Sequence, residues 1–327
     1  MSPPLIQTSE LTRRYGAVTS LDALSVVIEP GITGLVGANG AGKSTLAKIL
    51  LGLVSPSSGS ASVMGHDVVQ GRAQIRALVG YMPEHDCLPP DMSATEFVAF
   101  LARCSGLPAT AARERAAEVL RHVGLFEERY RPMGGYSTGM AQRVKLAQAL
   151  VHDPRILILD EPTNGLDPAG RDEMLALVAR TGHEFGISVL VSSHLLGELE
   201  RICERIVLIE QGRLRRVASV GSLTEATGTL VVELDRDAAT LQHFAQLLSA
   251  RGLTARLERH HVLVEVPAGD VPAGDVPAHD GTVPTGHHAP AEYAVYDAVR
   301  DVALSMDAGI LRLERRRGQL AELFHGQ

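Results

Sequence analysis

Cysteine, long apolar runs and positive charge are all scarce in this 327-residue chain. Cys87, Cys104 and Cys203 are odd in number and widely spaced, without a C-x-x-C pair, which argues against a disulfide framework or a zinc site and favours a reducing compartment. No apolar run approaches the roughly 20 residues that a membrane-spanning helix needs. The opening MSPPLIQTSELTRR has no apolar core of a secretory signal, so we expect a cytosolic chain.

Positive charge is also limited. The 31 lysines and arginines face 38 aspartates and glutamates, for a net charge of −7, which argues against nucleic acid as the main partner. Lysine occurs only at positions 43, 48 and 145, so nearly all the cationic residues are arginine. A hydrophobic content of 45% with 21% charged residues is ordinary for a globular protein, and the length allows two domains.

One glycine-rich segment organises the rest of the chain. It follows an apolar run, opens a helical pattern, and reads Gly37, Ala38, Asn39, Gly40, Ala41, Gly42, Lys43, Ser44, Thr45. Such glycines let successive backbone N–H groups face one anion, and the start of a helix adds its positive end. We expect Lys43 to reach the β- and γ-phosphates and the Ser44 hydroxyl to hold a shared Mg²⁺. A bare glycine-rich loop is more often a simple turn, but the Lys-Ser pair and both flanks favour a nucleoside-triphosphate site.

Two apolar segments predict buried parallel strands that end in polar residues. Ile156–Leu159 leads into Asp160 and Glu161, and Ile187–Val191 leads towards His194. Ligands bind at the carboxyl edge of such sheets. Asp160 suits a water-mediated Mg²⁺ contact, and Glu161 suits a base for the attacking water. The alternatives are structural ion pairs for the acids and an ordinary structural role for the histidine.

The segment from Ser93 to Val151 has a helical pattern, which indicates a helical insertion in an α/β domain. It begins with a capping box formed by Ser93 and Glu96. Ser137, flanked by glycines, starts a later helix either as an N-cap or as part of an anion site, and the local chemistry does not choose between them. Elsewhere, Tyr15 is either a base-stacking aromatic or a half-buried strand end, and Glu84 follows a strand that Pro83 breaks.

The last third predicts a small domain of its own. The pattern gives strands at 229–234, 254–257, 262–266 and 310–313 and helices at 238–250 and 293–306, an order that suggests a ferredoxin-like fold. A repeated Val-Pro-Ala-Gly-Asp pentapeptide occupies the loop at 266–290, which we expect to be extended. His279, His287 and His288 are of a residue type that binds metals, but we do not expect a metal site because a low-complexity loop does not hold them together.

Together these motifs, from about residue 4 to 220, resemble the ATP-binding subunit of ABC transporters. Gly37–Thr45 resembles the Walker A loop, Ile156–Glu161 the Walker B strand with its catalytic glutamate, and His194 the switch histidine. Tyr15 falls at the adenine-stacking aromatic and Asp167 in the D-loop. The signature motif, which contacts the opposing ATP, corresponds to Tyr136, Ser137, Thr138, Gly139 and Met140.

The resemblance implies a fold class: a P-loop NTPase domain of the ABC type, with a RecA-like core, an antiparallel β subdomain and a helical subdomain at about 88–152. A C-terminal accessory α+β domain of ferredoxin-like type follows at 228–325.

The sequence departs from the family motifs at two places. The signature reads Y-S-T-G-M instead of L-S-G-G-Q, and Glu84 replaces the glutamine of the Q-loop, where it remains a candidate Mg²⁺ ligand with an added charge. Both resemble ABC-2-type exporters of the drug-resistance and polysaccharide branch.

The same resemblance implies partners and cofactors. It predicts an ATP- and Mg²⁺-dependent ATPase, a second ATPase subunit arranged head to tail (a homodimer is expected), and a separately encoded transmembrane permease at the cytoplasmic face of the cell membrane. The alternatives are a soluble ABC-type ATPase acting on a ribosome or DNA complex, and a protein that binds ATP without turnover. The single cassette and negative charge count against the first, and Glu161 and His194 count against the second.

Overall fold

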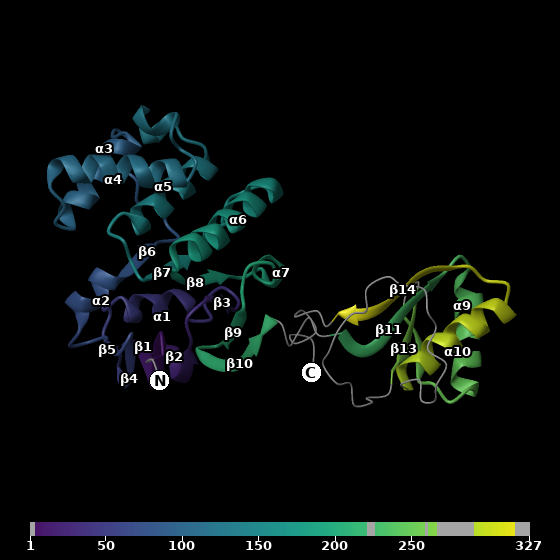
Figure 1. Ribbon diagram of the computed structural model, residues 1–327. Coiled ribbons are helices and arrows are strands. Elements are labelled where there is room, and N and C mark those ends of the chain that lie inside the picture. Colours follow the sequence, from purple (N-terminus) through teal and green to yellow (C-terminus); the bar gives the residue numbers. More distant parts are fainter. Residues whose placement is uncertain (1–3, 221–225, 259–260, 267–290, 318–327) are drawn as a thin grey trace, which may run out of the picture. The chain divides into compact units, whose positions relative to one another are not determined.

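The computed structural model describes residues 4–220, 226–258, 261–266 and 291–317 (Figure 1). The chain divides into two compact units, Met1–Gly221 and Ser222–Gln327, and each has a hydrophobic core of its own. Across these described ranges, every helix is too short or too polar to cross a bilayer.

A six-stranded sheet forms the centre of the first unit, in the order β10-β9-β3-β8-β7-β6. Its strands are β3 (Ile32–Val36), β6 (Val79–Met82), β7 (Ile156–Asp160), β8 (Ser188–Ser193), β9 (Arg205–Glu210) and β10 (Arg213–Ser219). Neighbours run parallel except β10, which pairs antiparallel with β9. β3, β7 and β8 are buried along their whole length, as expected for a parallel sheet covered on both faces. Their carboxyl ends therefore share one edge.

Helices cover both faces of this sheet: α1 (Lys43–Leu50), α2 (Arg72–Leu78), α6 (Pro168–Phe185) and α7 (Leu196–Leu199). The apolar side of α1 is completely buried in the core that joins the two sheets of this unit. Figure 1 shows α6 across the central sheet from α1. The sequence sets both ends of α6, because the Asp167 side chain caps its start and Gly186 adopts the left-handed conformation at its end.

An antiparallel sheet, in the order β2-β1-β4-β5, packs on α1. Its strands are β1 (Ile6–Tyr15), β2 (Val18–Ile28), β4 (Ser58–Val63) and β5 (His66–Asp67). From the sequence alone, the apolar residues Leu5–Ile6 and Leu24–Ile28 predict two short strands here, and these are shorter than β1 and β2. The register between β1 and β2 shifts three times, and each irregularity breaks the alternation of apolar and polar residues that the pattern relied on.

The predicted helical segment contains α3 (Ala94–Cys104), α4 (Ala109–His122) and α5 (Thr138–Leu150), which lie together in Figure 1. The capping box is confirmed: Ser93 Oγ accepts from the Glu96 backbone N–H at 3.3 Å, and Glu96 Oε2 accepts from that of Ser93 at 2.9 Å. Val98, Ala116 and Val144, one from each helix, are fully buried. This packing fixes the direction of α5, whose N-cap is Ser137.

Contact between β6 and α5 depends on Gly80. A Cβ at this position would lie 2.1 Å from the backbone oxygen of Ala149. Gly80→Ala is therefore expected to lower the free energy of unfolding of the first unit by about 1–3 kcal/mol, the range for overpacking, as measured by chemical denaturation. Gly197→Ala in α7 is the matched control, because its Cβ would meet nothing within 4 Å. Equal stability of the two variants would contradict this packing.

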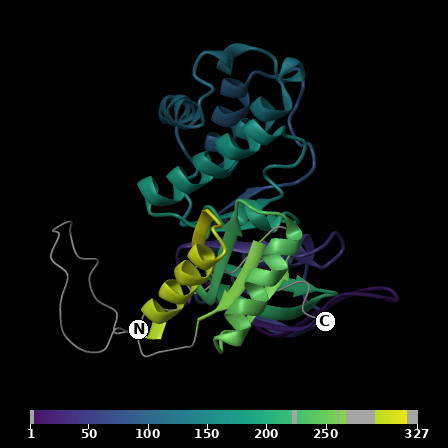
Figure 2. The ribbon, with the colours of Figure 1, turned by 90° about the vertical axis from the view of Figure 1, so that its right-hand side faces the viewer.

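The second unit contains β11 (Ala226–Leu234), α9 (Ala238–Ala250), β12 (Ala255–Glu258), β13 (His261–Glu265), α10 (Ala291–Ser305) and β14 (Ile310–Arg317). Its sheet has the order β12-β13-β11-β14 with antiparallel neighbours, which is the ferredoxin-like arrangement that the sequence predicted. Phe244 of α9 and Val299 of α10 are fully buried against one face of this sheet, where the two helices lie side by side (Figure 2). The pentapeptide repeat from residue 267 on and its three histidines lie outside the described residues.

Candidate functional site

A pocket of about 300 Å³ opens at the carboxyl edge of the central sheet. The loop between β3 and α1 forms most of its wall, and the lining residues are Ser20, Ala38–Thr45, Glu84 and Glu161. The predicted phosphate loop and the predicted catalytic glutamate therefore meet in one cavity. Gly37 of the predicted loop does not line the pocket.

The backbone of this loop requires glycine at position 42. Gly42 has a φ of 106°, a conformation that L side chains rarely adopt, and a Cβ there would lie 2.6 Å from the Ser20 backbone oxygen. The helix α1 begins at the next residue, so its free N–H groups point into the loop. The Ser20 and Thr45 hydroxyls lie 2.8 Å apart and tie the first turn of α1 to β2. This backbone geometry suits a bound anion.

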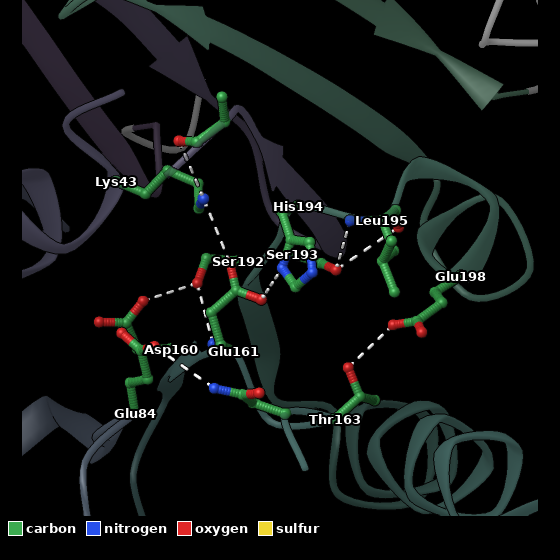
Figure 3. Close-up of polar contacts among 12 residues, drawn as sticks. Lys43, Glu84, Asp160, Glu161, Thr163, Ser192, Ser193, His194, Leu195 and Glu198 are labelled. Atoms are coloured by element: carbon green, nitrogen blue, oxygen red, sulfur yellow. Dashed lines mark hydrogen bonds and ion pairs between the residues drawn. The ribbon is translucent and has the colours of Figure 1, made fainter. Parts of the chain in front are cut away.

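Three titratable side chains meet beside the loop (Figure 3). Lys43 Nζ lies 3.2 Å from Glu161 Oε1, and it also donates to the Gly37 carbonyl at 2.6 Å. His194 Nδ1 lies 2.9 Å from Glu161 Oε2. The side chains of Lys43 and Glu161 are each only 6% exposed, whereas that of His194 is 42% exposed. Glu161 is thus a buried carboxylate held between two nitrogen groups, one of which faces solvent.

The backbone at Glu161 is unusual. Its φ is 49°, in the left-handed region that a residue with a Cβ rarely adopts and that is found preferentially at functional sites. The Glu161 N–H donates to Ser192 Oγ at 3.0 Å, and the Ser192 hydroxyl donates to Asp160 Oδ1 at 2.7 Å. Sequence reasoning missed Ser192. The signal was available, because the parallel register of β7 and β8 sets Ser192 opposite Asp160.

Glu84 reaches the pocket from the loop after β6. Its Oε1 accepts from Asn164 Nδ2 at 3.4 Å, and its backbone oxygen accepts from Lys145 Nζ at 2.9 Å. Burial lowers the pKa of Lys145, although nearby acidic groups oppose that shift. Burial, together with the charges of Asp160 and Glu84, raises the pKa of Tyr81 to about 12, so this phenol stays protonated. Lys145 was not predicted as a site residue.

A second group of side chains joins the turn after Glu161 to α7, which follows His194. Thr163 Oγ1 donates to Glu198 Oε2 at 2.8 Å, and Arg171 Nη1 donates to Glu198 Oε1 at 3.4 Å (the first contact is drawn in Figure 3). Asp167, predicted as the D-loop residue, accepts from the Gly170 N–H at 2.9 Å at the start of α6. The turn is therefore held at both of its ends.

Several predicted site residues lie away from this pocket. Tyr15 ends β1, is 44% exposed, and stacks with the Arg13 guanidinium, whose carbon is 4.5 Å from the ring centroid. Ser137 is exposed and caps α5 by accepting from the Met140 N–H at 3.3 Å. The remaining signature residues are Tyr136, which precedes this cap, and Thr138 and Gly139 in the first turn of the helix. None of them lines the pocket formed by their own chain.

The oxygen donors at the pocket fit a hard cation. Ser44 and Glu84 line it, and Asp160 lies buried behind it with one oxygen bound by Ser192. Within the part of the chain that the structure describes, no cluster of three or more His, Cys, Asp or Glu side chains is placed to hold a metal. Mg²⁺ uses few protein ligands and completes its shell with phosphates and water, so this sparse donor set suits it.

Comparisons with known proteins agree with this geometry. The family model described as ABC transporter matches residues 21–164. The chain is 38% identical over 211 residues to the bacitracin transport ATP-binding protein BcrA of Bacillus licheniformis, an alignment that covers 64% of this chain and 68% of that protein. It is 35% identical over 281 residues to the Nod factor export ATP-binding protein I of Burkholderia orbicola, which covers 79% and 91%.

A solved structure is similar as well. The cbiO1 structure from Clostridium perfringens, described as part of the ABC transporter complex cbiONQ, aligns with a TM-score of 0.61 at 28% identity and covers 67% of this chain and 90% of that one. This likeness confirms the predicted fold class of the first unit.

Proposed function

The chain belongs to the ABC transporter family as an ATP-binding and ATP-hydrolysing subunit. From this premise we propose which of its residues bind ATP and which act in its hydrolysis. The ATP-binding domain is residues 4–220, and the accessory domain is residues 228–325. The observation that carries the proposal is the position of Glu161, a buried carboxylate in the wall of the phosphate-loop pocket. Its contacts with Lys43 and His194 put a base, a cation and a polar orienting group within a few ångströms of each other.

Each residue has a distinct role in this proposal. The N–H groups of Ala38–Thr45 and the Lys43 ammonium bind the phosphates, and Tyr15 stacks on the base. Glu161 accepts a proton from the attacking water, while His194, held on Glu161 Oε2, fixes the direction of that carboxylate. Ser44, Glu84 and Asp160 would hold Mg²⁺, with Asp160 acting through water. ATP supplies the cleavable phosphoanhydride, and Mg²⁺ would neutralise the charge of its phosphates.

We further assign the chain to an exporter. The relatives named for bacitracin transport and Nod factor export support an efflux pump with a separate transmembrane permease. The chain then works at the cytoplasmic face of the membrane, where closure of two ATPase subunits drives the permease. These relatives give no support to the alternative of a ribosome- or DNA-directed ATPase, and nucleic acid is not a proposed partner.

The second ATPase subunit is proposed to be another copy of this chain, arranged head to tail. Ser137 and Gly139 are supported as contacts to the partner's ATP by their location: Ser137 is exposed at the start of α5 and outside the pocket of its own chain. A helix start with free N–H groups favours an anion. Asp167 of the D-loop is assigned to the same interface.

Charge at Ser137 tests this arrangement. In a Glu161→Gln background, ATP and Mg²⁺ are expected to convert the monomer to a dimer, and Ser137→Asp is expected to prevent it because a carboxylate would face the partner's phosphates. Ser137→Asn is the matched control, since asparagine and aspartate both cap helices but only aspartate is charged. Light scattering after size exclusion gives the mass, and a fluorescent ATP analogue reports binding. Dimers with Ser137→Asp, or loss of ATP binding by its monomer, would contradict the arrangement.

A further inference from the structure

Two of the three lysines of this arginine-rich chain are buried, one in the pocket wall and one in contact with Glu84. Lys43 is 6% exposed and Lys145 is 4% exposed, whereas Lys48 is exposed. Lys43 is the cation of the phosphate loop. Lys145 lies on α5, the helix that begins at the signature segment, and no sequence motif explains it. A buried ammonium costs free energy unless partners compensate it, so its presence needs a reason.

The contacts of Lys145 lead to Glu84. Lys145 Nζ donates to the Glu84 backbone oxygen at 2.9 Å, and the carboxylates of Glu84, Asp86 and Asp160 are close enough to act on its charge. This is an acidic region: Glu84 lines the pocket, and Asp160 lies buried next to it. The Lys43 ammonium is engaged by Glu161. Lys145 is therefore the buried ammonium that is in direct contact with Glu84.

The same face of α5 makes a second contact with the site. Gln142, one turn before Lys145, donates through Nε2 to the Asn164 backbone oxygen at 3.0 Å. Asn164 Nδ2 in turn donates to Glu84 Oε1 at 3.4 Å. These contacts and the backbone of α5 between Gln142 and Lys145 thus form a ring that joins α5 to the loop after β6 and to the turn after Glu161. Through this ring, the position of Glu84 depends on α5.

We infer that Lys145 is a positioning residue for Glu84, and that its charge allows a carboxylate instead of an amide to stand at position 84 beside Asp160. The inference rests on the proposed ATPase site. It accounts for two features together: the glutamate at position 84 in place of the expected glutamine, and the buried ammonium of Lys145, which has no other assigned role. Lysine suits the position because its slender stem carries a compact charge, which a planar guanidinium does not reproduce in a closed space.

A simple structural role makes a different prediction. If Lys145 only packs α5, its removal lowers stability and affects the site equally whether residue 84 is glutamate or glutamine. If Lys145 offsets the charge of Glu84, the two positions are coupled. Glu84→Gln is then more favourable with Lys145 absent than with Lys145 present, because in the absence of Lys145 it removes an uncompensated carboxylate.

A double-mutant cycle on the full-length chain separates these roles. The variants are Lys145→Met, Glu84→Gln and their combination, with Lys48→Met as the control for loss of an exposed lysine. Lys145→Met is expected to lower kcat/KM for MgATP about 10- to 100-fold, the range for a lost charge-assisted hydrogen bond. Glu84→Gln alone changes a proposed Mg²⁺ ligand, and its effect on kcat/KM in the wild-type background is the reference for the cycle. In the Lys145→Met background, the factor by which Glu84→Gln changes kcat/KM is expected to be about tenfold more favourable than that reference, a coupling normal for residues in contact.

Two additions keep the test decisive. Lys145→Gln runs the same cycle if Lys145→Met does not fold, because glutamine keeps an N–H donor without the charge. Equilibrium binding of a fluorescent ATP analogue with Mg²⁺ is measured in parallel, and it is expected to show coupling of the same sign. Equal effects of Glu84→Gln in both backgrounds would overturn the inference about Lys145. Absence of hydrolysis by the wild-type chain would instead refute the proposed function, and the binding cycle would still decide the role of Lys145.

Discussion

Glu161→Gln is expected to abolish steady-state ATP hydrolysis while ATP binding is retained. The substitution keeps the size of the side chain and its place between Lys43 and His194, but it removes the basic oxygen that takes a proton from water. Loss of a positioned general base costs about 10²–10⁴-fold in rate. Phosphate release under saturating MgATP measures turnover, and a fluorescent ATP analogue measures affinity.

The control is Glu118→Gln, which changes an exposed glutamate on α4. It is expected to behave as wild type in both assays. Unchanged turnover in Glu161→Gln would refute the assigned base. A loss of ATP binding equal to the loss of turnover would show that Glu161 supports the pocket instead of the chemistry.

Lys43→Met is expected to weaken ATP binding about 10- to 100-fold, the equivalent of one charge-assisted hydrogen bond. The ammonium is the only buried cation that the described residues place in the pocket wall, and methionine fills its volume without charge. The Glu161 carboxylate also loses its ion-pair partner and is left near the phosphates without compensation. Hydrolysis is therefore expected to fall further than affinity does.

Lys48→Met serves as control here too, because Lys48 lies five residues further along in α1 and is exposed. Titration of the fluorescent ATP analogue with and without Mg²⁺ gives the affinities. Wild-type affinity in Lys43→Met would contradict the assignment of this loop as the phosphate site. Equal losses in Lys43→Met and Lys48→Met would point to damage to α1.

The sequence predicted those parts of the site in which residue type alone determines the structure. Gly42 needs a positive φ, a run such as Ile156–Leu159 has to be buried, and Asp160 and Glu161 follow it directly. Because parallel strands share their direction, their carboxyl ends meet at one edge of the sheet, and this predicts the location of the site. The ferredoxin-like order of the second unit was predictable for the same reason, since each element there has clear apolar periodicity.

What sequence reasoning missed depends on register and on long-range contacts. β1 and β2 were predicted too short because register shifts interrupt the alternation of apolar and polar residues along them. Ser192 became a partner of Asp160 and Glu161 only once the pairing of β7 with β8 was known. Lys145 looked like an ordinary helix residue, and its contact with Glu84 spans 61 positions in the chain. No local pattern encodes such a contact.

The most direct test of the account is affinity purification of the tagged chain from detergent-solubilised native membranes, with identification of the proteins that copurify. We predict a polytopic membrane protein in stoichiometric amount, in a complex that hydrolyses ATP and loses that activity with Glu161→Gln. Recovery with ribosomes or a water-soluble assembly, and without a membrane protein, would contradict the transporter function and leave only the ATPase.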